Sequence, residues 1–409
     1  MDNTTLTLMK RALGAFMDYW EENSVTATLY ETDPTTGRLE VRNPETAMEM
    51  LFNYIQTRRN KLTSNRFELI TVEEPFAVPL DPDNPHILYV GRRDKIFRED
   101  RSIYVGEHKT TTFYSKKSIF RREFIDSFSP NSQVDGYAFS THAQYGSQVK
   151  GVQIDAALVH DKEHDGFKII PVERAFAQIS GWLWETQHWI AQIQANEAAL
   201  ISDKSIASLE YLPAFPKNTS SCTQYGGCPY MDICKMWSNP HSQGVPQGFV
   251  EKKWSPFDEL ELDKAKKIVG APKGKVTKKD ELYDNTRIST FRTCPRRYYF
   301  RHIRHWESSE DRRALLFGGA WHAAMDVVWT DLAPNWRDKM DVKERTQPRE
   351  KVYGAGSTLQ SKPAAQPSNR GSVFGGGHRT DAKNQAGAKG EGKSKKVGHK
   401  IPWFVPTNR

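Results

Sequence analysis

The chain has 409 residues, which is enough for one large domain with additions or for two ordinary domains. It is 37% hydrophobic and 26% charged, and no apolar run approaches the roughly 20 residues that span a bilayer. This pattern excludes a transmembrane protein, and the lack of a signal-peptide pattern at the N-terminus predicts a cytoplasmic location.

The net charge of +8 is unevenly distributed along the sequence. Residues 351–409 hold 11 Lys/Arg against 2 Asp/Glu, a net +9, so the rest of the chain is close to neutral. The basic balance therefore gives no evidence that a folded part binds DNA, and such a surface must come from local clusters. The two candidate clusters are Lys116-Lys117 with Arg121-Arg122, and Arg296-Arg297 with Arg301 and Arg304.

Hydrophobic periodicity predicts helices and strands in a mixed order. In chain order they are helices 5–22 and 44–60, strands 68–78, 86–97 and 102–111, helix 117–142, strands 149–159 and 167–172, and helix 173–200. The first helix is amphipathic, with Leu13, Phe16, Met17 and Trp20 at helical spacing. The apolar stripe of the last helix is interpreted as core packing, and its residues are Phe176, Ile179, Leu183, Trp189 and Ile190.

The stretch from Tyr89 to Thr110, YVGRRDKIFREDRSIYVGEHKT, is typical of two strands joined by a polar turn. Strand alternation puts Glu107 and Lys109 on one face of the second strand, and Asp94 on the neighbouring strand can lie within reach of both. The carboxylates can hold Mg²⁺ or Mn²⁺, while the lysine positions a nucleophile. The simpler interpretation is an exposed hairpin with a Glu107–Lys109 ion pair, since such a short pattern is common by chance.

Further motifs accompany these residues in a fixed order. They are the acidic segment Val72-Glu73-Glu74-Pro75-Phe76, then Gly91-x-x-Asp94, Glu107-x-Lys109 and Gln133-x-x-x-Tyr137. This order resembles the RecB-like branch of the PD-(D/E)xK nuclease superfamily. The resemblance implies an α/β fold of the restriction-endonuclease type, in which helices flank a mixed central sheet. It implies Asp94 and Glu107 as metal ligands, Lys109 as the residue that orients or activates water, and Gln133 and Tyr137 as residues that position the DNA backbone.

Three of the four cysteines, Cys222, Cys228 and Cys234, lie within thirteen residues of a Gly/Pro-rich loop, and the fourth is Cys294. Disulfides are not expected in the cytosol, and four thiolates suit either tetrahedral Zn²⁺ or an iron–sulfur cluster. The C-x₅-C-x₅-C spacing does not choose between them. The resemblance favours a [4Fe–4S] cluster, because CRISPR-associated and AddB-type exonucleases of this branch ligate one with a cysteine before the nuclease core and three after it.

The segment 286–331 is out of the family order. Ser289 to Tyr298 reads STFRTCPRRY and Phe317 to His322 reads FGGAWH, and both resemble opening motifs of the family although they follow the core. One explanation is a circular permutation, in which the segment folds back and supplies Cys294 to the cluster and His322 to the metal. The other is a truncated tandem copy without a partner. Outside the family context, His322 would be interpreted as an ordinary buried histidine.

Four parts of the chain are therefore predicted. They are a nuclease core with the Cys-rich loop at 1–237, a linker at 238–285, a displaced segment that completes the core at 286–335, and a disordered basic tail at 345–409. The resemblance implies a Mg²⁺- or Mn²⁺-dependent deoxyribonuclease, in the first place an exonuclease, that acts on single-stranded DNA or duplex ends in recombination, repair or phage DNA processing. Helicases or recombination proteins are the implied partners. The alternative is a catalytically silent DNA-binding or scaffold module, and a third is a zinc-stabilised binding protein.

Overall fold

The computed structural model describes residues 3–24, 32, 37, 40–81, 83–202, 205–224, 227–253, 255–256, 270, 275–309 and 313–339. These residues belong to one compact unit. The predicted basic tail, 345–409, lies outside them, as do parts of the predicted linker. Within the described part of the chain, no helix is both long and apolar enough to cross a membrane.

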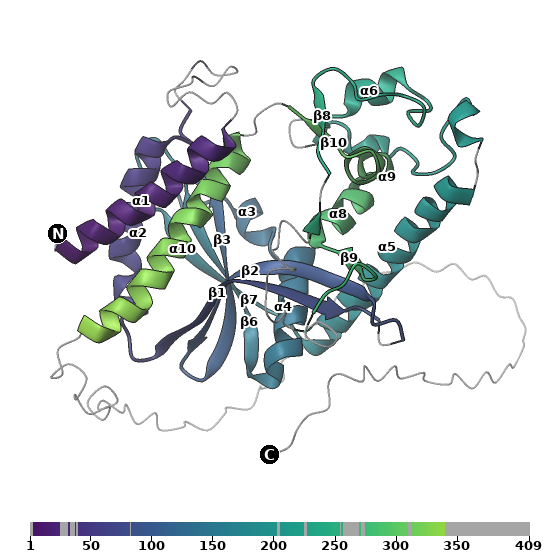
Figure 1. Cartoon of the computed structure of the whole chain (residues 1–409). Helices are drawn as coiled ribbons and strands as arrows, with labels where there is room; N and C mark the ends of the chain where they lie inside the picture. The colour runs from purple at the N-terminus through teal and green to yellow at the C-terminus, as the bar shows by residue number, and fades with distance from the viewer. Residues whose placement is uncertain are drawn as a thin grey trace, which may run out of the picture. The chain divides into compact units, whose positions relative to one another are not determined.

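A six-stranded mixed sheet forms the centre of this unit (Figure 1). Its order is β1-β2-β3-β6-β7, with β9 added beside β2. The strands are β1 Phe67–Pro79, β2 Ile87–Glu99, β3 Ser102–Thr111, β6 Val149–Leu158, β7 Phe167–Glu173 and β9 Glu281–Tyr283. The predicted polar turn joins β2 to β3, and Asp100 at its centre has a φ of 57°, a conformation that Asp tolerates better than most residues.

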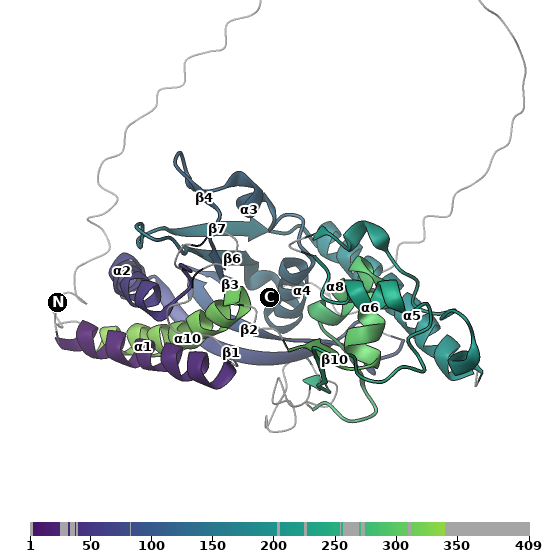
Figure 2. The same cartoon turned by 90° about the horizontal axis from the view of Figure 1, so that it is seen from above.

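Helices gather on both sides of the sheet, α1, α2 and α10 on one and α4 and α5 on the other (Figures 1 and 2). The longer helices are α1 Asn3–Asn23, α2 Pro44–Leu62, α4 Ser132–Tyr145, α5 Phe176–Ser202, α8 Asn285–Thr293 and α10 Arg313–Lys339. The short elements are β4 Tyr114–Ser115, β5 Ile119–Phe120, α3 Arg122–Asp126, α6 Met231–Met236, β8 Phe249–Glu251, α9 Pro295–Tyr298 and β10 Trp306–Ser308. The fold is mixed α/β and compatible with the restriction-endonuclease type.

The predicted helix over 117–142 was wrong in its first half. That range contains strand β5 and the single-turn helix α3, and only from Ser132 onward does α4 begin. Pro130 lacks a backbone N–H and disfavours helical geometry in the residue before it, so a continuous helix cannot pass through. Asn131 then starts α4 as its N-cap, because its side-chain oxygen accepts hydrogen bonds from the amides of Gln133 and Val134.

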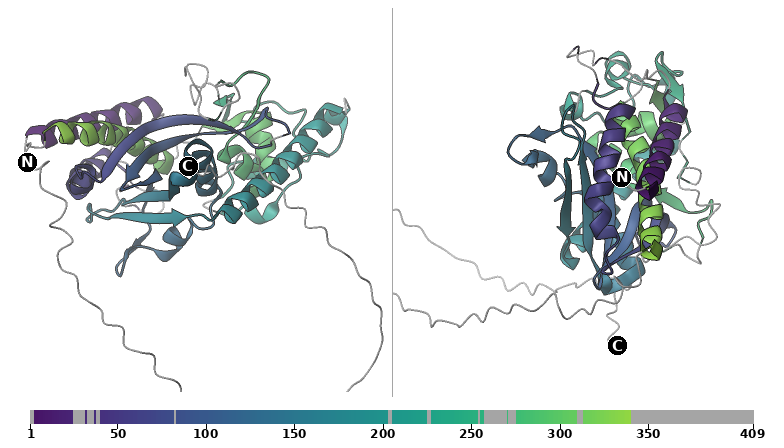
Figure 3. Two further views of the ribbon diagram at one scale, coloured as in Figure 1. Left: turned by 90° about the horizontal axis from the view of Figure 1, so that it is seen from below. Right: turned by 90° about the vertical axis from the view of Figure 1, so that its left-hand side faces the viewer.

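Helices α1 and α10 lie side by side and share an apolar core (Figures 1 and 3). Phe16 and Trp20 of α1 are fully buried, as predicted, and the Phe16 ring meets the edge of the Phe317 ring at a centroid distance of 5.4 Å. Gly319 permits this approach, since a Cβ there would lie 2.3 Å from the Tyr19 hydroxyl. The chain's first helix is therefore packed against a segment about 300 residues later.

The apolar stripe predicted for α5 is only partly buried. Ile179, Leu183 and Ile190 are core residues, whereas Phe176 is 50% exposed. Phe176 is the first residue of the helix, so it lies at the end of the apolar stripe.

The range expected to be a linker, 238–285, contains two strands. Strand β8 pairs with β10, and β9 pairs in parallel with the first residues of β2. Tyr283 lies opposite Tyr89 in this pairing, and both side chains are buried. Short strands of three residues give almost no periodic signal, which is why the sequence did not reveal them.

A buried histidine makes the stability of this region dependent on pH. Burial, together with the nearby cations Arg301 and Arg287, lowers the pKa of His302 from 6.5 to about 2. Between these pH values the unfolded state binds the proton and the folded state does not, so the folded state loses stability as the pH falls below 6.5. We expect the free energy of unfolding to fall by up to ~1.4 kcal/mol per pH unit through this group.

Urea denaturation at a series of pH values between about 7.5 and 5 measures this slope. The His302→Phe variant should show a shallower slope than the unmodified chain. The exposed His188, replaced in the same way, is the matched control and should leave the slope unchanged. An identical slope in the His302→Phe variant would show that other groups carry the effect.

Candidate active site

The β2–β3 pairing brings the three residues of the predicted metal motif together. Lys95 lies opposite Gly106 in the antiparallel register, which sets Asp94 beside Glu107. The Asp94 carboxylate accepts a hydrogen bond from the His108 amide at 2.7 Å. Lys109 donates to Oε1 of Glu107 at 2.5 Å. The predicted convergence on one hairpin is therefore present in the structure.

Helix α4 places Gln133 and Tyr137 against the same hairpin. Gln133 donates from Nε2 to Oε1 of Glu107 and to the Tyr137 hydroxyl, both at 3.1 Å. The Tyr137 hydroxyl donates to the Arg92 carbonyl of β2 at 3.0 Å. In this structure the two residues hold the Glu107 carboxylate and the adjacent backbone, and their predicted contact with a DNA backbone stays a prediction.

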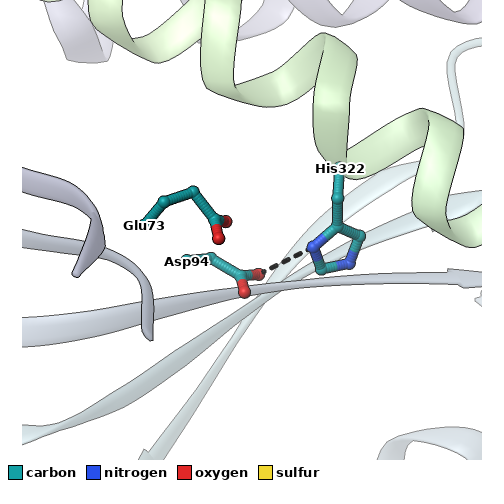
Figure 4. Close-up of side chains that lie close together, drawn as sticks. All are labelled: Glu73, Asp94 and His322. Atoms are coloured by element: carbon teal, nitrogen blue, oxygen red, sulfur yellow. Dashed lines mark ion pairs between the residues drawn. The ribbon is translucent and has the colours of Figure 1, made fainter. Parts of the chain in front are cut away.

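Helix α10 supplies His322 from a segment more than 200 residues distant along the chain. Its Nδ1 lies 3.4 Å from Oδ2 of Asp94, and its Nε2 lies 3.1 Å from the His108 carbonyl oxygen (Figure 4). Ligand atoms of Glu73, Asp94 and His322 all lie within 4.8 Å of one another. Three separate elements, β1, β2 and α10, thus point side chains into one site.

Two acidic residues of the site were missed as ligand candidates. Glu73 was noticed only as part of an acidic motif, and it adopts a φ of 50° within β1, a conformation that is rare for a residue with a side chain. Asp326 follows His322 by four residues, which places both on one face of α10. That H-x-x-x-D spacing was the signal in the sequence that could have found it.

The site brings several carboxylates together where little water reaches them. Burial raises the pKa of Glu73, and the neighbouring Asp326 and Asp94 raise it further. Burial and Asp94 also raise the pKa of Asp326. Burial and Asp94 likewise raise the pKa of Glu107, although Lys109 and His322 act to lower it. A divalent cation would relieve this repulsion, because it lowers the energy of the charged form of every carboxylate.

The donor set tests directly whether such a cation fits. Both donors to Glu107, Lys109 and Gln133, bind its Oε1. The other oxygen, Oε2, is buried and accepts no hydrogen bond from any residue that the structure describes. A buried carboxylate oxygen without a partner is costly unless a ligand completes it. Three or four carboxylates with one imidazole match the preferences of Mg²⁺ or Mn²⁺.

A second buried network lies behind this site and joins it to the core. The Nζ atom of Lys95 lies 2.8 Å from Nε2 of His108. It lies 3.4 Å from Oδ2 of Asp155 and also 3.4 Å from the centre of the Trp329 ring. Gly106 makes room for this lysine, since a Cβ there would lie 2.3 Å from its Cε. Asp155 also accepts hydrogen bonds from the Arg58 guanidinium at 2.5 Å and the Tyr54 hydroxyl at 2.6 Å.

Asp155 is the anion on which this network depends. Burial alone would raise its pKa, but Lys95 and Arg58 outweigh burial and hold the pKa well below its usual range. Asp155→Ala leaves two buried cations without their partner, so we expect the free energy of unfolding to fall by about 3–5 kcal/mol. Asp161, on the loop after the same strand, is exposed, and Asp161→Ala should cost less than about 0.5 kcal/mol. Chemical denaturation of both variants measures the difference, and a loss below about 1 kcal/mol for Asp155→Ala would contradict the assignment.

The four cysteines do not form a compact ligand group. Cys294 is buried and accepts a hydrogen bond from the Asn218 amide at 3.3 Å, while the other three are half-buried. Among the described residues, no three cysteine sulfur atoms lie within 4.8 Å of one another. Four thiolates on one tetrahedral Zn²⁺ would lie about 3.8 Å apart, so the arrangement does not fit a formed zinc site. The predicted [4Fe–4S] cluster is likewise not shown.

The comparison with known families bears on this arrangement. Residues 285–368 match the family model of the PD-(D/E)XK nuclease superfamily. This similarity suggests a nuclease and a DNA substrate. The matched range is about a fifth of the chain and includes Cys294 and His322, but not Asp94, Glu107 or Lys109. No curated protein and no solved structure matches the chain.

Proposed function

We propose that this protein is a Mg²⁺- or Mn²⁺-dependent nuclease that hydrolyses phosphodiester bonds of DNA. One observation carries the proposal. Glu73, Asp94 and His322 converge with Glu107 and Lys109 on one site, although they come from four separate elements of the chain. Surface ion pairs do not require such convergence, whereas a metal centre does.

A bound Mg²⁺ or Mn²⁺ would polarise the scissile phosphate and lower the pKa of a water molecule. Asp94, Glu107 and His322 would hold it, and Glu73 and Asp326 extend the acidic lining. Oε2 of Glu107 is the oxygen that remains available, since both neighbouring donors occupy Oε1.

Lys109 acts in this proposal as a fixed positive charge. Burial would lower its pKa, but the Glu107 carboxylate outweighs burial and raises the pKa above its ordinary value. The side chain is therefore an ammonium group at neutral pH, suited to orient a water or a phosphate oxygen rather than to remove a proton. Gln133 fixes the same carboxylate from the side of α4.

The finer assignments rest on the order of the sequence motifs. We infer an exonuclease that acts on single strands or duplex ends in recombination, repair or phage DNA processing, together with helicase or recombination proteins. We also infer that Cys222, Cys228, Cys234 and Cys294 hold a [4Fe–4S] cluster. This inference rests on the cysteine pattern of the sequence, since burial raises the pKa of the Cys234 thiol to about 11 even though Lys217 and Arg296 oppose that effect.

The test is a cleavage assay with the full chain, purified anaerobically. Labelled single-stranded, blunt and overhanging DNA are incubated with Mg²⁺ or Mn²⁺, and iron, sulfide and zinc are measured in the same preparation. We expect cleavage that a chelator abolishes, and iron in place of zinc. The absence of cleavage on every DNA, in a protein that still binds Mn²⁺, would overturn the nuclease assignment.

The second candidate is a catalytically silent DNA-binding or scaffold module. The observation in its favour is that the family match begins only at residue 285, after the hairpin that carries Asp94 and Glu107. Such a module would bind DNA equally well with and without a divalent cation and would release no product.

A further inference from the structure

The segment directly after the E-x-K strand exposes apolar side chains. Strands β4 and β5 form a small antiparallel hairpin, and residues 113–122 are called the Phe113 hairpin below. Phe113 is 53% exposed and Ile119 is 46% exposed. Ile119 adopts a φ of 66°, which is a strained conformation for a β-branched residue. Exposed apolar groups on a strained turn are more typical of a binding surface than of core packing.

The same hairpin carries four basic side chains, Lys116, Lys117, Arg121 and Arg122, all of them exposed. Among the residues that the structure describes, Lys116 and Lys117 have no carboxylate partner within ion-pair distance. Arg122 pairs with Asp126 at 3.1 Å, but both side chains are well exposed, so this pair holds it only weakly. The hairpin therefore presents positive charge around an exposed aromatic ring.

Two members of the other basic cluster, Arg296 and Arg304, are occupied within the fold. Arg296 is buried and donates to the carbonyl oxygens of Phe215 and Ser238. Arg304 donates to three backbone carbonyls of the loop 240–243. These guanidinium groups hold the fold together, and they are not available to a phosphate. The structure thus shows four exposed basic side chains on the Phe113 hairpin, whereas at least two of the four in the other cluster serve the fold.

The Phe113 hairpin is held firmly in place. The Arg121 amide donates to the Phe113 carbonyl at 3.1 Å, and its side chain donates to the Tyr114 carbonyl at 3.2 Å. The Arg121 guanidinium lies 5.8 Å from the centre of the Phe113 ring, and the Tyr114 ring lies 4.6 Å from the His160 ring. A fixed ring loses little conformational entropy when a ligand stacks on it.

The hairpin is also close to the candidate cleavage site. Phe113 follows Lys109 by four residues, so their backbones lie within about 14 Å of each other. That distance corresponds to about four steps of a nucleic-acid strand at the duplex rise.

We propose that the Phe113 hairpin is a stacking platform for the bases of a single DNA strand that leads into the cleavage site. This proposal rests on the proposed function and names its substrate class. Phe113 stacks on a base, and the four basic side chains contact the neighbouring phosphates. Every base has a flat face, so stacking on one ring gives affinity for single strands without a preference for sequence.

The experiment measures binding in a chain that cannot cleave, with Glu107→Gln as the common background. Two labelled single strands of equal length are compared, one with normal bases and one with abasic residues around its end. Phe113→Ala should weaken binding of the normal strand by roughly 5- to 150-fold and leave the abasic strand unchanged, because only the first has bases to stack. Phe113→Trp should retain the affinity.

Charge is tested separately with the double variant Lys116→Ala/Lys117→Ala. It should weaken the binding of both strands equally. The slope of log affinity against log salt concentration should become shallower by about 1.4, since two phosphate contacts are lost. Trp184→Ala is the matched control, because Trp184 is 68% exposed but lies on α5. Trp184→Ala should leave the affinity for both strands unchanged.

The outcomes separate the two proposals. If Phe113→Ala weakens the binding of normal and abasic strands equally, or changes the binding of neither, the stacking platform is wrong while the nuclease assignment stands. If the chain with an intact Glu107 cleaves no DNA and Phe113→Ala still discriminates the two strands, the nuclease assignment fails and the platform remains. Circular dichroism of each variant verifies the fold, which an exposed side chain is not expected to disturb.

Discussion

Glu107→Gln is expected to reduce metal-dependent DNA cleavage by about 10³-fold or more, since it replaces a charged ligand with a neutral one. The substitution keeps the size of the side chain and its hydrogen bonds at Oε1. It removes the negative charge that a cation at Oε2 would meet. Calorimetric titration with Mn²⁺ should show weaker binding in parallel with the loss of turnover.

Lys109→Ala separates the role of the lysine from that of the ligands. It should lose cleavage to a similar extent but retain Mn²⁺ binding, because the lysine is a cation and cannot be a ligand itself. Removal of its charge also takes a competitor away from Glu107, so the Mn²⁺ affinity should stay the same or rise.

Glu99→Gln is the matched control for these variants. Glu99 lies at the far end of β2 and pairs with Lys61 at 3.0 Å, away from the metal ligands. It should retain full activity. Full activity in Glu107→Gln would contradict the assignment of the site, and loss of Mn²⁺ binding in Lys109→Ala would show that the lysine supports the ligands instead of the chemistry.

The hairpin part of the site could be predicted because its geometry is local. The pairing of β2 with β3 follows from a short turn, and strand alternation then fixes Glu107 and Lys109 relative to Asp94. The role of Glu73 was harder to predict, because its position depends on an unusual backbone conformation in β1 that hydrophobic periodicity does not indicate. To predict Asp326 as a site residue, one would have to know that α10 covers the hairpin, and this is a contact between segments distant in sequence.

Other features could not be derived from local patterns for a similar reason. The three residues of β9 become a strand only because the first part of β2 has a free edge beside them. The buried network joins Asp155 of β6 to Lys95 of β2 and to Arg58 and Tyr54 of α2, and each of these residues alone reads as an ordinary polar position. The cysteines show the opposite case, since a strong pattern in the sequence does not appear in the described part of the structure as sulfur atoms close enough for one tetrahedral Zn²⁺.

A chain that ends at residue 253 is expected not to fold, whereas a chain that ends at residue 339 should unfold at nearly the same temperature as the full chain. The shorter chain lacks β9 and α10. Helix α10 contributes several large buried side chains to the core it shares with α1, among them Phe317, Trp321, Met325, Val328 and Trp329. Burial of these side chains stabilises the fold by roughly 7–15 kcal/mol, which equals the whole stability of an ordinary domain.

This truncation also decides between the two explanations of the displaced motifs. If 286–331 were the stump of a second copy, the core would fold without it, and the chain that ends at 253 would keep a cooperative thermal transition. If the segment completes the core, that chain is unfolded, and it should recover structure when a separate fragment of residues 281–339 is added. The comparison uses circular dichroism for the fold and Mn²⁺ binding for the site, because His322 returns with the fragment. A point variant, His322→Ala, controls for the ligand alone: it should weaken Mn²⁺ binding while the thermal transition stays cooperative, since the side chain is only half-buried.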